Sequence, residues 1–198
     1  DWYIGSCTKI KYMFPKAHAV AYVMMCIRIA WYKVHMPQYY YSVFFSCRCD
    51  AYEIETMAGG IEAVYNRMTD IKTRSESKDR AISSTVTNKE ESLYSALEVV
   101  YEMYRRGYSI TNIDINRSHA TQFTVDPDDS HKIIPPFTAM DGLGEAVGIS
   151  IMKARDEQPF ISKQDLSQRT QLSGTHIQKL EEMGCLKGMQ DTNQLSLF

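Results

Sequence analysis

Long apolar stretches with helical spacing dominate the first third of the chain. Between about residues 9 and 41, apolar groups occupy nearly every face of a helix, and Pro15 and Pro37 interrupt the pattern. This pattern predicts a short element, a loop and one long buried helix that ends at Pro37. The stretch YYYSVFFSCRC predicts a second helix. A third is expected over residues 52–72, where a GG pair marks a weak point or a start.

Polar residues then replace the apolar pattern. Residues 73–92 are rich in Ser and Thr and have no apolar period, which predicts a surface connection or a flexible insert. The following stretch SLYSALEVVYEMYRRG is amphipathic, and Gly107 stands where a C-cap is expected. Its apolar stripe consists of Leu93, Leu97, Val100 and Tyr104. We therefore expect a helix with one face packed on a core.

Two short runs with β character follow this helix. They are SITNIDINRS and ATQFTVD, of which the second alternates apolar and polar residues and ends at the turn-forming DPDD. The rest of the chain has helical spacing again. The whole pattern predicts a mainly α fold with a small β element in its middle.

The last third repeats one small motif. Residues 138–160 and 162–185 each predict a helix, a tight glycine turn and a second helix. In the first copy, Gly142 and Gly144 flank Leu143, which we expect to point inward between the helices. Glycines permit positive φ and leave the amides uncovered, while the next helix supplies unpaired donors and a favourable dipole. This geometry suits a phosphate.

Tandem turns of this kind form the helix-hairpin-helix pattern, whose amides bind a backbone phosphate and so hold duplex DNA without reading its sequence. In the second turn, QLSGTH, the corresponding residues are Leu172, Ser173, Gly174, Thr175 and Lys179. The second helix of the first copy begins near Glu145. The carboxylates of Asp141 and Glu145 would repel a phosphate at this turn and so oppose its binding. A purely structural turn stays open as the alternative, above all for the first copy taken alone.

Charge and cysteine content narrow the function classes. The net charge of −2 over 198 residues argues against a uniformly basic nucleic-acid binder. The first 49 residues, however, hold only one acid, Asp1, against the bases Lys9, Lys11, Lys16, Arg28, Lys33 and Arg48. Five irregularly spaced cysteines fit reduced thiols in a cytoplasm, and the CRC spacing disfavours zinc. Arg28 and Lys33 argue against a membrane span in the longest apolar run.

The motif FPKAHAVAY resembles the fingers of the C family of bacterial replicative DNA polymerases. The segments IDINRSHATQFTVD, IPPFTAMDGLGEAVGISIMKAR and QLSLF then follow in the order of the PolC-type branch, so the resemblance covers essentially the whole chain. It implies the carboxy-terminal piece of a longer enzyme. The expected divisions are fingers (1–72), a polar linker or insert (73–92), a helix with a small β element in a clamp- and duplex-binding region (93–134), tandem hairpins (135–188) and a flexible tail (189–198).

The residues of the first motif suit a nucleotide. Lys16 and His18 stand at the start of a helix, where an ammonium, an imidazole and the amide dipole all favour a triphosphate. Tyr22 is one turn further on the same face and can present its ring to the incoming base. A capping or packed histidine is the alternative for His18. The resemblance also implies a DNA backbone contact for Arg117, for which a salt bridge within its turn is equally expected.

The end of the chain matches a partner motif. The residues Gln194, Leu195, Ser196, Leu197 and Phe198 resemble the motif that binds the bacterial β sliding clamp, in which the glutamine bonds at the rim and the apolar groups fill a pocket. We expect the polar leader KGMQDTN to free this tail from the last helix. The alternative is a tail that folds back onto its own hairpins.

The resemblance implies part of a DNA-directed DNA polymerase that contacts the incoming dNTP, primer-template duplex, the clamp and other replisome subunits in the bacterial cytoplasm, without a membrane. It places the Mg²⁺-binding aspartates in a palm outside this sequence, so we expect no metal site, no bound cofactor and no catalytic residue in the chain, and no polymerisation by the chain alone. Ser/His/Asp, HExxH and P-loop patterns do not occur in it. The competing interpretation is an autonomous, non-catalytic DNA-binding adaptor that docks on the clamp.

Overall fold

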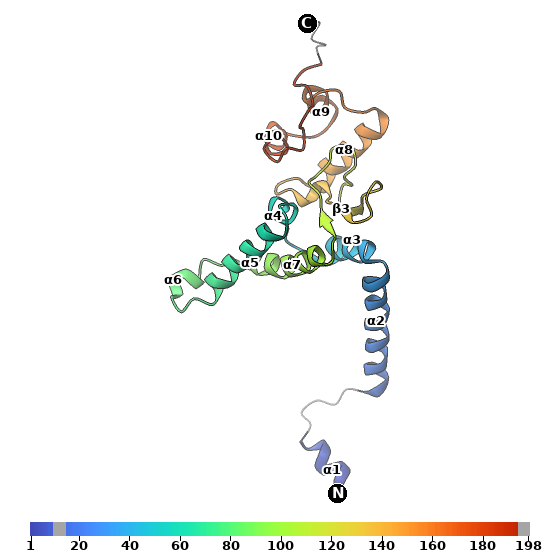
Figure 1. Cartoon of the computed structure of the whole chain (residues 1–198), viewed down its shortest axis with the longest axis vertical. Coiled ribbons are helices and arrows are strands. Elements are labelled where there is room, and N and C mark those ends of the chain that lie inside the picture. Colours follow the sequence, from blue (N-terminus) through green and yellow to red (C-terminus); the bar gives the residue numbers. More distant parts are fainter. Residues whose placement is uncertain (10–14, 194–198) are drawn as a thin grey trace.

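The computed structural model describes residues 1–9 and 15–193 and is mainly helical (Figure 1). Its helices are α1 (Trp2–Cys7), α2 (Lys16–His35), α3 (Pro37–Arg48), α4 (Ile54–Ala58), α5 (Ile61–Ser75), α6 (Arg80–Ser83), α7 (Asn88–Arg105), α8 (Glu145–Glu157), α9 (Lys163–Arg169) and α10 (Gly174–Glu182). The strands are β1 (Ser109–Ile110), β2 (Thr124–Val125) and β3 (Lys132–Ile134). The predicted class, mainly α with a small β element, is confirmed.

Helices α5 and α7 lie side by side, and the short α6 joins them at their far end (Figure 1). Residues 73–92 therefore hold the end of α5, α6 and the start of α7 on the surface, rather than an unstructured insert. The predicted stripe of α7 is correct: Leu93, Leu97 and Val100 are buried, and Tyr104 packs half-buried beside them. The helix ends at a glycine, as expected, because Gly107 has a φ of +84°.

The small sheet has the strand order β1-β3-β2. Strand β3 pairs in parallel with β1 and antiparallel with β2. The two runs with β character contain β1 and β2, but the central strand β3 was not predicted. A strand of three residues is too short to show a period of two, and its pairing with β1 joins residues more than twenty positions apart.

Helix α3 ties the sheet to the helices. Tyr41 and Phe45 are fully buried, and the Ser42 hydroxyl donates to the carbonyl oxygen of Phe123. One contiguous apolar core runs from this helix through α5, α7 and the sheet to the hairpins. The C-terminal region is therefore packed on the rest of the molecule.

The exposure of helix α2 differs from the prediction. This helix was expected to be long and buried, but none of its residues is buried, and it projects away from the body beyond α3 (Figure 1). Tyr22 and Ile27 are both about 60% exposed. Apolar residues on all faces are typical of a helix that is covered on all sides. Within residues 1–9 and 15–193, α3 is the main neighbour of α2 and leaves most of its surface open.

The GG pair between α4 and α5 does interrupt the helical pattern, as predicted. Gly60 has a φ of +95° and is the N-cap of α5. In contrast, the first element of the first hairpin is not a helix but a single 3-10 turn, Phe137–Ala139. Two prolines directly before it fix an extended backbone, so few residues remain for a helix before the glycine turn.

Candidate nucleic-acid interface

The turn of the first hairpin connects the 3-10 turn to α8. Gly142 adopts a φ of +90°, which a residue with a side chain adopts only with strain. Leu143 is buried, as predicted, and its amide donates to the carbonyl oxygen of Met140 at 3.1 Å. The buried Leu143 side chain thus anchors the turn to the core, while Gly144 and Glu145, which follow it, are exposed.

The N-terminus of α8 is open. Its N-cap is Gly144, and no side chain among residues 1–9 and 15–193 caps the helix. A Cβ placed on Gly144 would meet no atom of the described residues within 4 Å, so they leave the space beside it free. The first amides of a helix have no partner within it. The first hairpin therefore presents uncovered donors at the positive end of a helix dipole.

The second hairpin, between α9 and α10, is closed to a greater degree. Leu172 is buried like its counterpart Leu143, but the hydroxyl of Ser173 accepts from the His176 amide at 3.2 Å. In return, Nδ1 of His176 accepts from the Ser173 amide at 3.3 Å. This capping box occupies both the hydroxyl and the amide of Ser173, a residue expected from the sequence to bind phosphate. Gly174 and Thr175 remain exposed at the turn.

The two hairpins contact each other through α10. The Lys179 ammonium donates to the carbonyl oxygen of Asp141 at 3.1 Å, and Nε2 of His176 lies 3.1 Å from the carbonyl oxygen of Gly142. Because Nδ1 of His176 accepts from Ser173, a neutral His176 ring carries its proton on Nε2 and donates to Gly142. The second hairpin thus holds the turn of the first.

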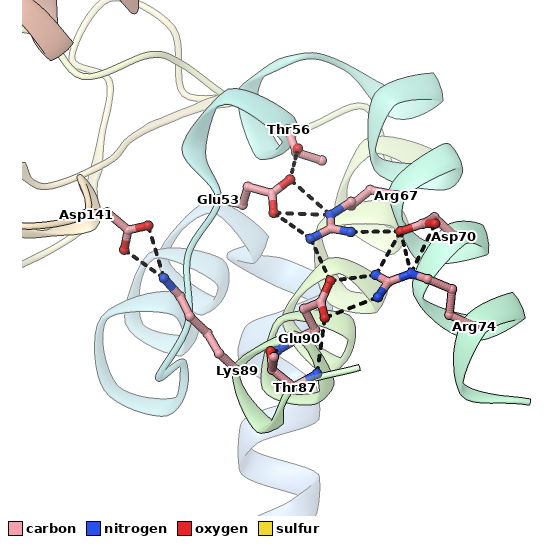
Figure 2. A network of polar contacts seen from close by, with 9 residues as sticks. All are labelled: Glu53, Thr56, Arg67, Asp70, Arg74, Thr87, Lys89, Glu90 and Asp141. Carbon is pink, nitrogen blue, oxygen red and sulfur yellow. Dashed lines mark hydrogen bonds and ion pairs between the residues drawn. The ribbon is translucent and has the colours of Figure 1, made fainter. Parts of the chain in front are cut away.

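A cation from outside the hairpins balances the predicted repulsion at the first turn. The ammonium of Lys89, on the first turn of α7, lies 2.8 Å from a carboxylate oxygen of Asp141 (Figure 2). Both side chains are largely exposed, so the pair is worth at most about 1 kcal/mol. It nevertheless keeps a positive charge beside the turn. Glu145, in the first turn of α8, is also exposed.

An ion-pair network fixes the start of α7, from which Lys89 extends. Figure 2 shows Glu90 between two arginines of α5, with its carboxylate 3.1 Å from Arg67 and 2.5 Å from Arg74. Glu90 also accepts from the Thr87 amide and so completes a capping box. Hydrogen bonds from Arg74 lower the pKa of Glu90 to about 2. The network joins α4, α5 and α7 through Glu53, Arg67, Asp70, Arg74 and Glu90.

Arg117 forms salt bridges within the chain, but mainly with the DPDD turn that follows β2 rather than within its own turn, as the alternative had it. Its guanidinium lies 2.9 Å from Asp126 and 2.5 Å from Asp128, and Asp114 is near at 3.7 Å. These carboxylates oppose a phosphate at this position. The DNA contact of Arg117 stays a prediction, but its charge is already balanced within the chain.

The three predicted nucleotide residues lie together on the N-terminal half of α2. Lys16 and His18 are exposed, and the rings of His18 and Tyr22 meet edge to face with centroids 4.4 Å apart. They therefore share one helix face, as expected from their spacing. This face belongs to the projecting helix and lies apart from the hairpins (Figure 1).

The predicted clamp motif, residues 194–198, lies outside the described residues. The leader before it is not free, however. The amides of Lys163 and Gln164 donate to the carbonyl oxygens of Gln190 and Asp191, so residues 190–193 are docked on the N-terminus of α9. The prediction of a free leader was wrong, because the unpaired amides of α9 capture the backbone that the polar composition suggested was solvated.

Two residues near the turns were not identified from the sequence. His176 occupies the N3 position of a capping box, a pattern that its spacing from Ser173 contains. Lys89 lies 52 residues before Asp141, and no local pattern predicts that contact.

The cleft beside the first turn, 280 Å³ in volume, is lined by Glu53, Glu55, Asp141 and Glu182 with Lys179, a charge balance that disfavours an anionic ligand.

The described residues contain neither a cluster of metal ligands nor a membrane-spanning helix. Nowhere in residues 1–9 and 15–193 do three His, Cys, Asp or Glu side chains gather as a metal ion requires. Over the same residues, none of the helices combines the length and the apolarity that crossing a bilayer requires.

Comparison with known proteins agrees with the hairpin geometry. A family model described as a helix-hairpin-helix motif matches residues 107–195. The chain is 48% identical over 198 residues to the DNA polymerase III PolC-type of Streptococcus sanguinis (strain SK36) and 49% identical to that of Streptococcus pneumoniae (strain ATCC BAA-255 / R6). That of Streptococcus thermophilus (strain ATCC BAA-491 / LMD-9) is 48% identical. Each alignment covers 100% of this chain and 13% of the relative.

Proposed function

Because the chain is homologous along its whole length to a segment of PolC-type DNA polymerase III, we propose that it works as part of a replicative DNA polymerase that extends a primer on chromosomal DNA. The observation that carries this proposal is the 48–49% identity over all 198 residues. The chain spans 13% of the length of these relatives. Its own contributions are duplex binding, contact with the incoming nucleotide and attachment to the sliding clamp.

The hairpins hold the duplex. The open N-terminus of α8 at Gly144 and the exposed Gly174 and Thr175 supply backbone donors for phosphates, and Lys179 adds a charge between them. Backbone donors do not distinguish bases, so binding is independent of sequence. Such a grip suits an enzyme that must move along every sequence it copies.

Helix α2 meets the incoming nucleotide. Lys16 and His18 bind the triphosphate, and Tyr22 stacks on or beside the base. Their exposure and shared helix face support this role. The cationic first 49 residues favour the same ligand, because Asp1 is the only acid among them.

The chemical step takes place elsewhere in the enzyme. Phosphoryl transfer in polymerases uses two Mg²⁺ ions held by carboxylates, and in our proposal these belong to a palm outside the 198 residues. What this chain supplies is position: it orients duplex and nucleotide. The isolated chain is therefore expected not to extend a primer.

Residues 194–198 tether the enzyme to the β sliding clamp. Burying Leu195, Leu197 and Phe198 is worth roughly 1.5 to 3 kcal/mol each before the cost of ordering them, and that cost reduces the net affinity to a modest value. A modest affinity suits a tether, because linkage to DNA-bound polymerase raises its effective concentration without preventing exchange.

A chimera tests the proposal. The corresponding segment of the S. pneumoniae PolC-type relative is replaced by this chain, and primer extension is measured with and without the S. pneumoniae β clamp. The chimera should extend primers and respond to the clamp, whereas deletion of residues 194–198 should abolish only the clamp response. Lys16→Ala and His18→Ala should raise the KM for dNTP far more than the Kd for duplex. A chimera that binds duplex but cannot extend a primer would contradict the proposed role.

A further inference from the structure

The residues that lead into the clamp motif are built into the second hairpin. The Lys163 amide donates to the carbonyl oxygen of Gln190 at 2.8 Å, and the Gln164 amide donates to that of Asp191 at 3.1 Å. Lys163 and Gln164 are the first two residues of α9, where amides have no partner within the helix. Docking of Gln190 and Asp191 therefore satisfies donors that a free leader would leave to water.

Side chains strengthen this docking at both ends. The fully buried Ser162 donates from its hydroxyl to the Asn193 side-chain oxygen at 2.5 Å, and the Asn193 amide donates to Oε1 of Gln164 at 3.2 Å. The Lys163 ammonium lies 2.7 Å from Asp191 and also pairs with Glu181 of α10. Residues 190–193 thus bond directly to the start of α9 and are linked to α10 only through Lys163. We call them the anchor segment.

The segment just before the anchor is also packed. Leu186 is 3% exposed, and Met189 packs against the core. Gly188, between them, has a φ of +87°, which turns the chain toward α9. The path from α10 to Asn193 is therefore defined by burial, a glycine turn and paired backbone groups.

We propose that the anchor segment fixes the point at which the clamp-binding motif leaves the hairpins, so that clamp and duplex are engaged at a set distance from each other. This inference rests on the clamp attachment proposed above. A short, fixed tether gives the second contact a high effective concentration, which falls with about the −3/2 power of tether length. Asp191 and Asn193 are then positioning residues: they do not touch the clamp but decide where the motif is offered to it.

The double variant Asp191→Ala/Asn193→Ala tests this inference in the full chain. The probes are the S. pneumoniae β clamp free in solution and the same clamp loaded on a primed duplex. Affinity for the free clamp should stay within about twofold, while affinity for the loaded clamp should fall about tenfold, because several leader residues become flexible. Faster amide exchange at Lys163 and Gln164 reports release of the anchor. Glu157→Ala/Gln158→Ala, which removes an exposed acid and amide at the end of α8, is the matched control.

A second variant covers the case in which the backbone bonds alone hold the segment. Insertion of Gly-Ser-Gly-Ser between Asn193 and Gln194 lengthens the tether with the anchor intact, and it should weaken binding to the loaded clamp several-fold. Unchanged or tighter binding of the loaded clamp by both variants would overturn the inference, as would an equal loss for free and loaded clamp. Retained clamp binding after deletion of residues 194–198 would instead refute the proposed attachment itself.

Discussion

The Lys179 ammonium lies 3.1 Å from the carbonyl oxygen of Asp141, so a helix of the second hairpin holds the turn of the first. His176, one turn earlier, makes the same kind of contact with Gly142. The two hairpins therefore form one surface on which their turns keep a fixed separation. The phosphates of a duplex are also regularly spaced. We therefore expect the two turns to bind two phosphates of the same duplex together, which can be tested.

Two neighbouring glycines should respond differently to alanine. Gly142→Ala should lower the free energy of unfolding by about 1 kcal/mol, because a side chain is strained at a φ of +90°. Gly144→Ala should change it by less than about 0.5 kcal/mol, because Gly144 has a φ of −80° and open space beside it. Urea denaturation of both variants measures this difference. Equal effects would show that Gly142 does not need its conformation.

The charges beside the first turn should tune DNA affinity in opposite directions. Asp141→Asn should raise duplex affinity up to about fivefold and Lys89→Gln should lower it by a similar factor, because exposed charges are worth up to ~1 kcal/mol. The double variant should bind nearly like the unaltered chain. Fluorescence anisotropy with a labelled duplex at low salt measures all three. Lower affinity of Asp141→Asn would place the phosphate elsewhere.

Acid should weaken the start of α7 through Glu90. Its folded pKa of about 2 lies below the ordinary value of 4.5, so its pairing with Arg74 stabilises the fold above about pH 4.5, and this contribution is lost as the pH falls toward 2. Glu90→Gln should therefore lower the free energy of unfolding most above about pH 5 and least near pH 2. The exposed neighbour in Glu91→Gln is the control. Chemical denaturation across this pH range decides: a difference independent of pH would contradict the assignment.

Arg106 should stabilise the last turn of the projecting helix α2. Its guanidinium donates to the carbonyl oxygen of Lys33 at 2.9 Å and pairs with Glu102, which also binds the Lys33 ammonium at 3.0 Å. Arg106→Gln should speed amide exchange in the last turn of α2 about tenfold, since a hydrogen bond to a charged group is worth ~1.5 kcal/mol or more. Arg105→Gln, which alters an exposed neighbour, should not. Equal exchange in the two variants would mean that α3 alone fixes α2.

The sequence predicted the parts of the fold that local pattern controls. The stripe of α7, the break at Gly60 and the inward Leu143 all follow from spacing and glycine chemistry. Strand β3 was not predicted, because three residues show no period of two and its pairing with β1 joins residues more than twenty positions apart. The docked anchor segment was missed because its bonds join backbone groups, which composition does not reveal.

The candidate site also contains features that the local sequence predicts and features that depend on tertiary packing. The spacing predicted that His18 and Tyr22 share one helix face, and their rings do lie together on it. The spacing between Ser173 and His176, three positions later, is that of a capping box and would have predicted the capping role of Ser173. No such spacing predicts the pair between Lys89 and Asp141, because only tertiary packing brings α7 to the hairpin turn. Exposure of α2 is also a tertiary property, since an apolar helix shows its hydrophobic faces in the sequence but not what covers them.

The measurement that tests the central claim most directly is duplex binding by Gly144→Val/Gly174→Val across a salt titration. A Cβ at either position meets no atom within 4 Å in the part of the chain that the structure describes, so thermal unfolding should show an intact fold. If both turns hold phosphates, the double variant should lose about tenfold or more in affinity, since one charge-assisted hydrogen bond is worth ~1.5 kcal/mol or more. Affinity for the unaltered chain should also fall steeply with salt and not depend on duplex sequence. Unchanged affinity and salt dependence in a folded double variant would show that the turns only shape the protein and do not hold DNA.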